Sequence, residues 1–182
     1  MPQVYINPIT KEKATILKTS ATTNGAYTLI EVELQPGGGN PIHFHEQFTE
    51  DFYPQEGILG VHYLGKELFL SPDESFKVPF LDAHRFYNPG EHPITFRAKL
   101  EPGQPDFENF IAVLFGLVSD GKTFGKNQIP YHPFHALLLL HWGDTQIDHF
   151  LFRFLKPFLS MLVALSRKLG YEKKLIQKYK SI

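Results

Sequence analysis

Three histidines and one glutamate stand in the sequence at spacings that suit a metal site. His43 and His45 are separated by one residue, so on a β-strand both imidazoles project to the same face. Glu50 can return on a neighbouring strand after a short bend, and His84 offers a fourth ligand from another strand. Imidazole nitrogens and a carboxylate are ligands that suit Fe, Mn, Ni, Co, Cu or Zn. The four residues therefore predict a site for one divalent transition metal.

The spacing of these residues resembles that of the two motifs of the cupin superfamily. The first motif is G-x5-H-x-H-x4-E-x6-G, and every fixed position is matched, by Gly37, His43, His45, Glu50 and Gly57. The second motif is G-x5-P-x-G-x2-H-x3-N, and it is matched by Pro79, His84 and Asn88. Asp73 and Leu81 stand where the second motif has glycines. These departures touch turn positions rather than ligands, so they concern loop geometry more than metal binding.

The resemblance implies a fold and a ligand set. The fold would be an all-β double-stranded β-helix, a jelly-roll barrel, and the whole chain looks like a cupin type 2-like protein with a C-terminal α-helical extension. The metal would be held inside the barrel by His43, His45, Glu50 and His84. If its coordination is octahedral, two positions remain for water, oxygen or substrate.

Hydrophobic periodicity divides the chain into two regions. Strict alternation at 27–34 and 94–100 predicts strands with one buried face, and similar short runs extend from residue 4 to about residue 101. After Pro102-Gly103 the period becomes helical. We therefore expect a barrel over residues 1–102 and a helical region over residues 103–182, packed on the barrel or at an oligomer interface.

Three helices are expected in the second region. The first covers 107–118 with Asp106 as its N-cap, and the second runs from Pro133 to about Leu140. The third covers about 145–169, with Pro157 inside it and Gly170 as its C-cap, and the last residues extend it as a short basic helix.

Composition excludes several classes of chemistry. The 182 residues include no cysteine, which rules out disulfides, thiolate metal sites and a cysteine nucleophile. The formal net charge of -1 gives no reason to expect nucleic acid as a partner. It is a cancellation, because residues 1–150 carry a net charge of -8 and residues 151–182 a net charge of +7.

Other candidate sites are weaker. His45-Glu46 opens an H-E-x-x-H frame, but Thr49 occupies the place of the second histidine. Three consecutive glycines, Gly37 to Gly39, lack the Lys-Ser/Thr of a phosphate loop. A second cluster of potential ligands fits no single helix face, so we expect capping or surface roles for its members: His132, His135, His141, Asp144, Asp148 and His149.

Aromatic residues flank the predicted ligands. Phe52 lies two residues after Glu50 and Phe86 two residues after His84, so each shares the face of a ligand. These side chains either pack in the core or line a substrate pocket that selects an apolar or aromatic molecule.

The C-terminal segment 149–169 is apolar nearly all round and precedes several lysines. Such a helix must be buried, and we expect it against the barrel or at the interface of a homodimer. A peripheral contact with anionic lipid is the alternative. The N-terminus lacks the features of a signal peptide and the longest uncharged run is too short to span a membrane, so we expect a cytoplasmic protein without nucleic-acid partners.

Two functions remain open from the sequence. One is a metalloenzyme, dioxygenase- or isomerase-like, that acts on a small apolar or aromatic molecule; the residues indicate no general base. The other is a non-enzymatic module that binds or senses a small ligand, and a membrane-peripheral structural role is a further alternative.

Overall fold

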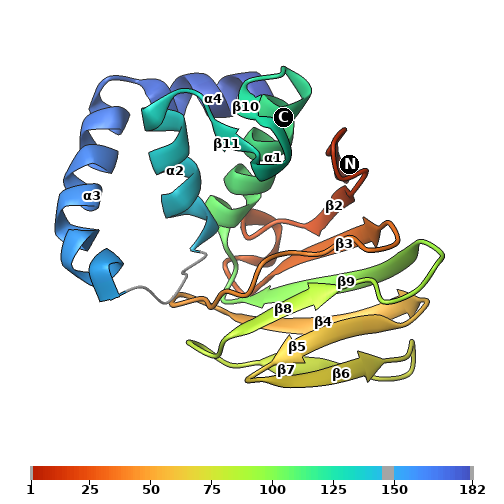
Figure 1. Ribbon diagram of the computed structural model, residues 1–182. Helices are drawn as coiled ribbons and strands as arrows, with labels where there is room; N and C mark the ends of the chain where they lie inside the picture. The colour runs from red at the N-terminus through yellow and green to blue at the C-terminus, as the bar shows by residue number, and fades with distance from the viewer. Residues whose placement is uncertain (1, 145–149, 181–182) are drawn as a thin grey trace.

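The computed structural model describes residues 2–144 and 150–180, and in it strands precede helices along the chain (Figure 1). The main strands are β1 (Gln3–Ile6), β2 (Lys13–Lys18), β3 (Thr28–Leu34), β4 (Thr49–Glu56), β5 (Leu59–Tyr63), β6 (Lys66–Leu70), β7 (Phe76–Val78), β8 (His84–Tyr87) and β9 (Ile94–Glu101). The helices are α1 (Pro105–Ser119), α2 (Pro133–Gly143), α3 (Phe150–Lys168) and α4 (Tyr171–Tyr179). A short hairpin, β10 (Thr123–Phe124) and β11 (Ile129–Pro130), separates α1 from α2.

Two antiparallel sheets enclose the core of the strand region. The larger sheet has the order β1-β2-β3-β9-β4-β7, and the smaller has the order β6-β5-β8. Neighbours that are distant in sequence, such as β3 with β9 and β4 with β7, close the structure into the predicted jelly roll. The expected fold class, an all-β jelly-roll barrel followed by a helical extension, is confirmed.

Alternation of side chains explains the central strands. In β3, the side chains of Thr28, Ile30, Val32 and Leu34 are buried and the residues between them are partly exposed. Strand β9 repeats this pattern beside it. We call the cluster of buried apolar residues between the two sheets the barrel core: Tyr5, Ala14, Ile16, Ile30, Val32, Leu34, Phe48, Phe52, Leu59, Val61, Leu70, Val78, Ile94, Phe96, Ala98, Leu100, Ile111, Ala112 and Phe115. Three of these residues come from α1, so this helix packs on the barrel.

The helices also form a core of their own. We call it the helical core, and its buried residues are Val113, Leu117, Leu138, Leu139, Trp142, Val163 and Leu175. Helix α1 contributes to both cores, because Ile111 faces the strands while Val113 and Leu117 face α2. In Figure 1 the helices gather on one side of the strands, with α3 at the outer edge.

One helix start differs from the prediction. Helix α1 has Gln104 as its N-cap, and Asp106 lies inside the first turn without capping the helix. Pro105 explains the shift, because proline has no N–H to satisfy and its fixed φ angle suits the first helical position. Asp106 still carries its negative charge near the N-terminal end of the helix dipole, where it is favourable.

Burial of the third helix against the barrel or at a homodimer interface stays a prediction, and within the single chain only one face of the described part of α3 is covered. Val163 and Ser166 are buried, but Phe158, Met161 and Leu165 are exposed. The reason is that α3 packs against α2 and α4 along one face only. The predicted start of this helix at residue 145 lies outside the described residues, and Gly170 adopts φ 80° where α3 gives way to α4. No helix in the described ranges has the length and the apolar character needed to cross a bilayer.

Candidate metal centre

The four predicted ligands come from three places in the barrel. His43 and His45 lie in an extended segment before β4, where His43 pairs with His84 through two backbone hydrogen bonds of 2.9 and 2.8 Å. Glu50 is the second residue of β4 and lies between Val78 on β7 and Leu100 on β9. His84 begins β8. The sheet pairing therefore brings together residues that are up to 41 positions apart (84 minus 43).

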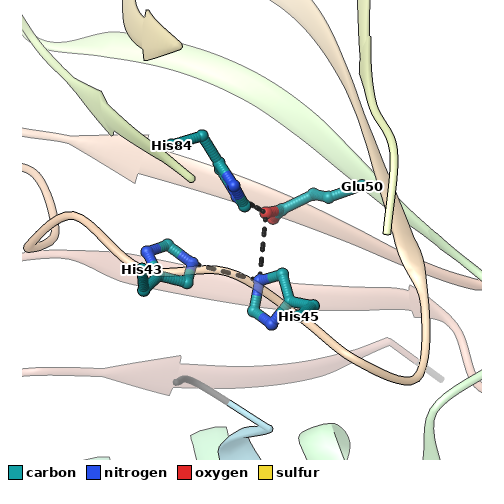
Figure 2. A group of neighbouring side chains, drawn as sticks. All are labelled: His43, His45, Glu50 and His84. Carbon is teal, nitrogen blue, oxygen red and sulfur yellow. Dashed lines mark hydrogen bonds and ion pairs between the residues drawn. The ribbon is translucent and has the colours of Figure 1, made fainter. Parts of the chain in front are cut away.

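Their polar atoms converge on one small volume. Nε2 of His43 lies 3.0 Å from Nε2 of His45. One carboxylate oxygen of Glu50 lies 3.1 Å from Nε2 of His84 and 3.5 Å from Nε2 of His45. All four candidate ligand atoms lie within 4.8 Å of one another, and all four residues are buried. Figure 2 shows the three rings and the carboxylate directed toward one another.

Backbone carbonyls fix the orientation of the three rings. Nδ1 of His43 contacts the carbonyl of Pro41 at 2.9 Å, Nδ1 of His84 contacts that of Asp82 at 2.8 Å, and Nδ1 of His45 contacts that of Asp144 at 3.0 Å. A carbonyl oxygen can only accept a hydrogen bond, so each Nδ1 carries the hydrogen. Each Nε2 then presents a lone pair, or a second, exchangeable proton, to the centre of the cluster.

Burial and neighbouring charges set the protonation of the cluster. Burial lowers the pKa of His43 to about 4, and the charges of His45 and His84 add to this effect. Burial by itself raises the pKa of Glu50, but hydrogen bonds with His45 and His84, and their charges, outweigh it and hold this pKa well below its usual range. Burial lowers the pKa of His84, but its hydrogen bonds with Glu50 and the Asp82 carbonyl and the charges of Glu50 and Asp82 together outweigh burial, so the net shift is upward. Glu50 is therefore an anion that shares a proton with His84 when no other cation is present.

The donor set fits a transition-metal ion. Nitrogen lone pairs 3.0 Å apart repel each other unless a cation lies between them, and a buried carboxylate also requires a positive partner. A metal ion would replace the shared proton and satisfy all four atoms together. Three neutral imidazoles and one carboxylate form a nitrogen and oxygen site that suits Fe, Mn, Ni, Co, Cu or Zn. The ligand atoms do not distinguish among these metals.

The glycines and the asparagine of the two motifs have structural roles. Gly37 and Gly57 adopt φ values of 70° and 78°, which disfavour other residues, and a Cβ on Gly57 would lie 2.4 Å from Ile94. Asn88 donates from its side chain to the carbonyls of Leu34 and His92, so it joins two chain segments.

Leu81 occupies one of the two motif positions where glycine is replaced. Its φ is 68°, the conformation that glycine would adopt, and its N–H donates to the carbonyl of His45 at 2.9 Å. Asp73, at the other position, is not among the described residues with positive φ. The loop beside His45 therefore keeps its geometry despite the missing glycines.

Of the two predicted pocket residues, Phe52 lies next to the cluster and Phe86 packs against Phe52. Phe52 is 0% exposed and its ring centroid lies 6.3 Å from that of His84. Phe86 is partly buried, and its ring lies 5.9 Å from Phe52 and 5.0 Å from Phe96. Both residues pack in the barrel core, and a role in substrate selection stays a prediction.

Three residues near the ligands were not predicted as part of the site. Phe48 stacks on His45 with ring centroids 4.1 Å apart, and Phe107 of α1 meets the same imidazole edge-on at 6.2 Å. Asp144 ends α2 and is 5% exposed, and its carbonyl holds His45. The expected capping role of Asp144 is confirmed, because it is the C-cap residue of α2, and its burial excludes the alternative of a surface role. Its contact with His45 is an additional role. The sequence carries no signal for this contact, because the two residues are 99 positions apart.

The remaining members of the second predicted cluster that the structure describes do not join the centre. His132 caps α2 by accepting a hydrogen bond from the N–H of Phe134. His141 lies 3.8 Å from Asp106, and both side chains are exposed. Asp148 and His149 lie outside the described residues. In the ranges that the structure describes, the only group of three or more potential ligand residues that meet is His43, His45, Glu50 and His84.

Comparison with known proteins identifies the barrel. Residues 30–103 match the family model described as "Cupin domain". A solved RmlC-like cupin from Shewanella frigidimarina NCIMB 400 superposes with a TM-score of 0.50 at 20% sequence identity, covering 59% of this chain and 89% of that one. This likeness concerns the fold alone.

Two curated relatives match parts of the chain. Probable oxidoreductase virH from Hypocrea virens (strain Gv29-8 / FGSC 10586) is 31% identical over 90 residues, covering 46% of this chain and 41% of that protein. Epoxidase atD from Aspergillus terreus (strain NIH 2624 / FGSC A1156) is 42% identical over 60 residues, covering 32% of this chain and 18% of that protein. The matched segments span less than half of either relative.

Proposed function

Since residues 30–103 match the cupin-domain family model, we propose that this protein holds one divalent transition metal through His43, His45, Glu50 and His84 and acts on a small molecule there. The observation that carries the proposal is the convergence of three Nε2 atoms and one carboxylate oxygen within 4.8 Å, while every Nδ1 is engaged by a carbonyl. Purely structural histidines have no need to direct their second nitrogens toward one point.

The chemistry of the proposed site follows from its donors and its walls. A bound metal would supply a Lewis acid and, if it is redox-active, an electron donor or acceptor. Glu50, whose carboxylate oxygen lies 3.1 Å from Nε2 of His84, would supply the anionic ligand of that metal. Phe52 and Phe86 would make the surroundings apolar and favour an apolar or aromatic substrate. The printed names of the two curated relatives, an oxidoreductase and an epoxidase, support an oxygenase-like reaction over an isomerase-like one.

Metal analysis of protein purified without added metal tests the site. We expect close to one metal ion per chain in the wild type and little in the variants His43→Ala and Glu50→Ala. His62→Ala is the matched control, because His62 is a barrel histidine whose Nδ1 binds Glu67 away from the cluster. Equal metal content in the wild type, His43→Ala and Glu50→Ala would refute the proposed site.

Oxygen uptake distinguishes an enzyme from a binding module. The metal-loaded protein is given a panel of aromatic and aliphatic small molecules, and consumption of oxygen and substrate is measured. Substrate-dependent turnover that Glu50→Ala abolishes supports the enzyme. Binding of a panel member without turnover would instead support a ligand-binding or sensing cupin.

A second candidate function is contact with an anionic membrane surface through α3. Phe158, Met161 and Leu165 are 54%, 58% and 43% exposed and lie three and four residues apart, so they form one apolar stripe. The neighbouring exposed cations are Arg167, Lys168, Lys173 and Lys174. An exposed apolar stripe beside lysines is typical of helices that lie in the interface of anionic bilayers.

Vesicle sedimentation tests this candidate. We expect binding to vesicles that contain phosphatidylserine, weaker binding to neutral vesicles, and loss of binding in the double variant Met161→Ser/Leu165→Ser. Phe69→Ser is the matched control, because Phe69 is equally exposed, at 58%, but lies on β6. If the wild type does not bind vesicles and is a dimer, whereas the double variant is a monomer, the stripe is a homodimer interface and the membrane candidate is wrong.

A further inference from the structure

The three histidines of the metal centre are not oriented in the same way. His43 and His84 each use a carbonyl two residues earlier in their own chain segment, at Pro41 and Asp82. His45 uses the carbonyl of Asp144, which belongs to the end of α2. Two ligands are therefore oriented by the barrel alone, whereas the third depends on the helical region.

Asp144 is fixed on the segment that carries His45 by its own side chain. One carboxylate oxygen accepts hydrogen bonds from the N–H groups of Glu46 and Gln47, both at 2.8 Å. The other lies 3.3 Å from the side-chain amide of Gln47. The carboxylate thus binds the two residues that follow His45, while the carbonyl of the same residue binds the imidazole. We call this arrangement the clamp: the carbonyl of Asp144 holds the His45 ring and its carboxylate holds the next two residues.

The backbone of Asp144 is adapted to this contact. Its φ and ψ are 43° and 29°, a left-handed conformation in which aspartate, asparagine and glycine are the tolerated residues. The turn ends α2 and directs the last carbonyl of the helix toward the barrel. Charge-assisted hydrogen bonds between a carboxylate and backbone N–H groups are stronger than neutral ones, so they can hold the turn in place.

Among the contacts of the His45 ring, the hydrogen bond to Asp144 is the one that fixes which ring nitrogen faces the metal centre. Phe48 stacks on the ring with an interplanar angle of 26° and confines its plane. Stacking does not distinguish the two faces of the imidazole, so a ring flip would exchange Nδ1 with Cδ2, and Nε2 with Cε1, without losing this contact. The hydrogen bond to the Asp144 carbonyl does distinguish them, because only Nδ1–H can donate there.

We propose that Asp144 is a positioning residue for His45, so that the helical region, through the end of α2, completes the metal centre of the barrel. The inference rests on the proposed function as a metal-binding cupin. A partner of this kind fixes the tautomer of a ligating histidine and raises its basicity, and its loss typically lowers metal affinity about 10–100-fold. The proposal also gives the helices a role in the site beyond covering the barrel.

Three substitutions separate the parts of the clamp. Asp144→Gly removes the carboxylate but keeps the backbone carbonyl and permits the left-handed turn. Asp144→Ala also removes the carboxylate, and its Cβ disfavours the left-handed turn. Asp144→Asn keeps an acceptor oxygen and the turn. We expect affinity for Co(II), measured by competition with a chromophoric chelator, to fall about 10–100-fold in the first two variants and by less than about 3-fold in Asp144→Asn. The electronic spectrum of bound Co(II) should change in the glycine and alanine variants alone.

Asp120→Ala is the matched control for damage to the helices. Its carboxylate joins the end of α1 to Lys178 and Tyr179 of α4 but does not touch the centre. The control should lose stability and keep the affinity and the spectrum of Co(II). If it loses affinity as much as Asp144→Gly does, general loosening of the helices explains the result and the positioning role is refuted.

Two further measurements keep this inference distinct from the proposed function. If His45→Ala abolishes Co(II) binding while all three Asp144 variants bind as the wild type does, the metal site stands and the clamp is wrong. If the wild type and His45→Ala bind Co(II) equally weakly, the proposed function itself fails. Nitrogen NMR of the metal-free wild type requires no folded variant: a His45 ring that carries its hydrogen on Nε2 would overturn the clamp, whereas hydrogen on Nδ1 supports it.

Discussion

The barrel core and the helical core both border a close pair of histidines, and the two pairs differ in what lies opposite their nitrogens. The ring centroids of His43 and His45 are 4.6 Å apart, and so are those of His132 and His135. In the barrel, Nε2 atoms converge with the Glu50 carboxylate. Beside the helical core, His132 turns Nδ1 to the N–H of Phe134, and both rings pack against Tyr171.

This difference shows that proximity of imidazoles does not make a metal site. Burial lowers the pKa of His135 to about 4, as it does for His43, and in both cases neighbouring charges add to the effect. Each pair therefore has close rings and one histidine with a lowered pKa. What distinguishes the barrel is a buried carboxylate and carbonyls that direct every Nε2 inward. Four predictions test the comparison, from the largest expected effect to the smallest.

The helical core should be as sensitive to truncation as a barrel core. Leu138 is fully buried in it, and Leu138→Ala should lower the free energy of unfolding by about 2–5 kcal/mol through lost burial and a residual cavity. Leu140→Ala, on the same helix but 40% exposed, should change it by less than about 0.5 kcal/mol. Urea denaturation measures both. Equal effects would mean that the helices lack a packed core.

Metal should stabilise the protein through the barrel histidines only. A ligand present at 100 times its Kd stabilises the folded state by about 2.7 kcal/mol, which corresponds to a rise in Tm of about 5–10 °C for a chain of this size. His84→Ala should abolish the rise that Zn(II) or Co(II) produces in a thermal melt, and His135→Ala should keep it. If His135→Ala abolishes the metal-dependent rise in Tm and His84→Ala keeps it, the metal binds beside the helical core and not in the barrel.

The capping role of His132 predicts a smaller effect on stability. His132→Ala removes the acceptor for the N–H of Phe134 and should destabilise the protein by about 1 kcal/mol, without changing its metal content. His132→Asn should restore the stability, because asparagine is among the preferred N-cap residues. Thermal melts of the metal-free proteins report the effect. If asparagine fails to rescue the alanine variant, His132 acts through its ring packing instead.

The smallest effect concerns the loop that supports His45. Leu81 adopts φ 68° and is 61% exposed, so Leu81→Gly relieves backbone strain and removes little packing. We expect a gain of about 0.5–1 kcal/mol after the greater entropy of glycine in the unfolded chain is subtracted. The measurement is the urea midpoint of the metal-free protein. A loss of stability would show that the exposed leucine side chain contributes more than the strain removes.

The strand region and the ligand set were largely predictable. Alternation in β3 and β9 depends on the two-residue repeat of a strand, which a one-dimensional pattern preserves. The motif spacing predicted that His43, His45 and Glu50 lie close together, because residues near one another in a hairpin-like segment keep a fixed relation in space. The N-cap of α1 was misplaced by two residues, at Asp106 instead of Gln104, since Pro105 competes with aspartate as a start signal.

The candidate ligand set of this protein can be read from its sequence because each of its members is placed by local geometry and by strand pairing that the motifs encode. The contact between Asp144 and His45 arises only when α2 packs beside the barrel, since no periodicity links two residues 99 positions apart. The sequence also did not predict which face of α3 is exposed in the single chain. Apolar residues all round a helix indicate burial, but the face that is covered depends on how α2 and α4 pack against the helix. Local geometry and strand pairing place the four candidate ligands, and the tertiary packing of helices on strands places the group that orients His45.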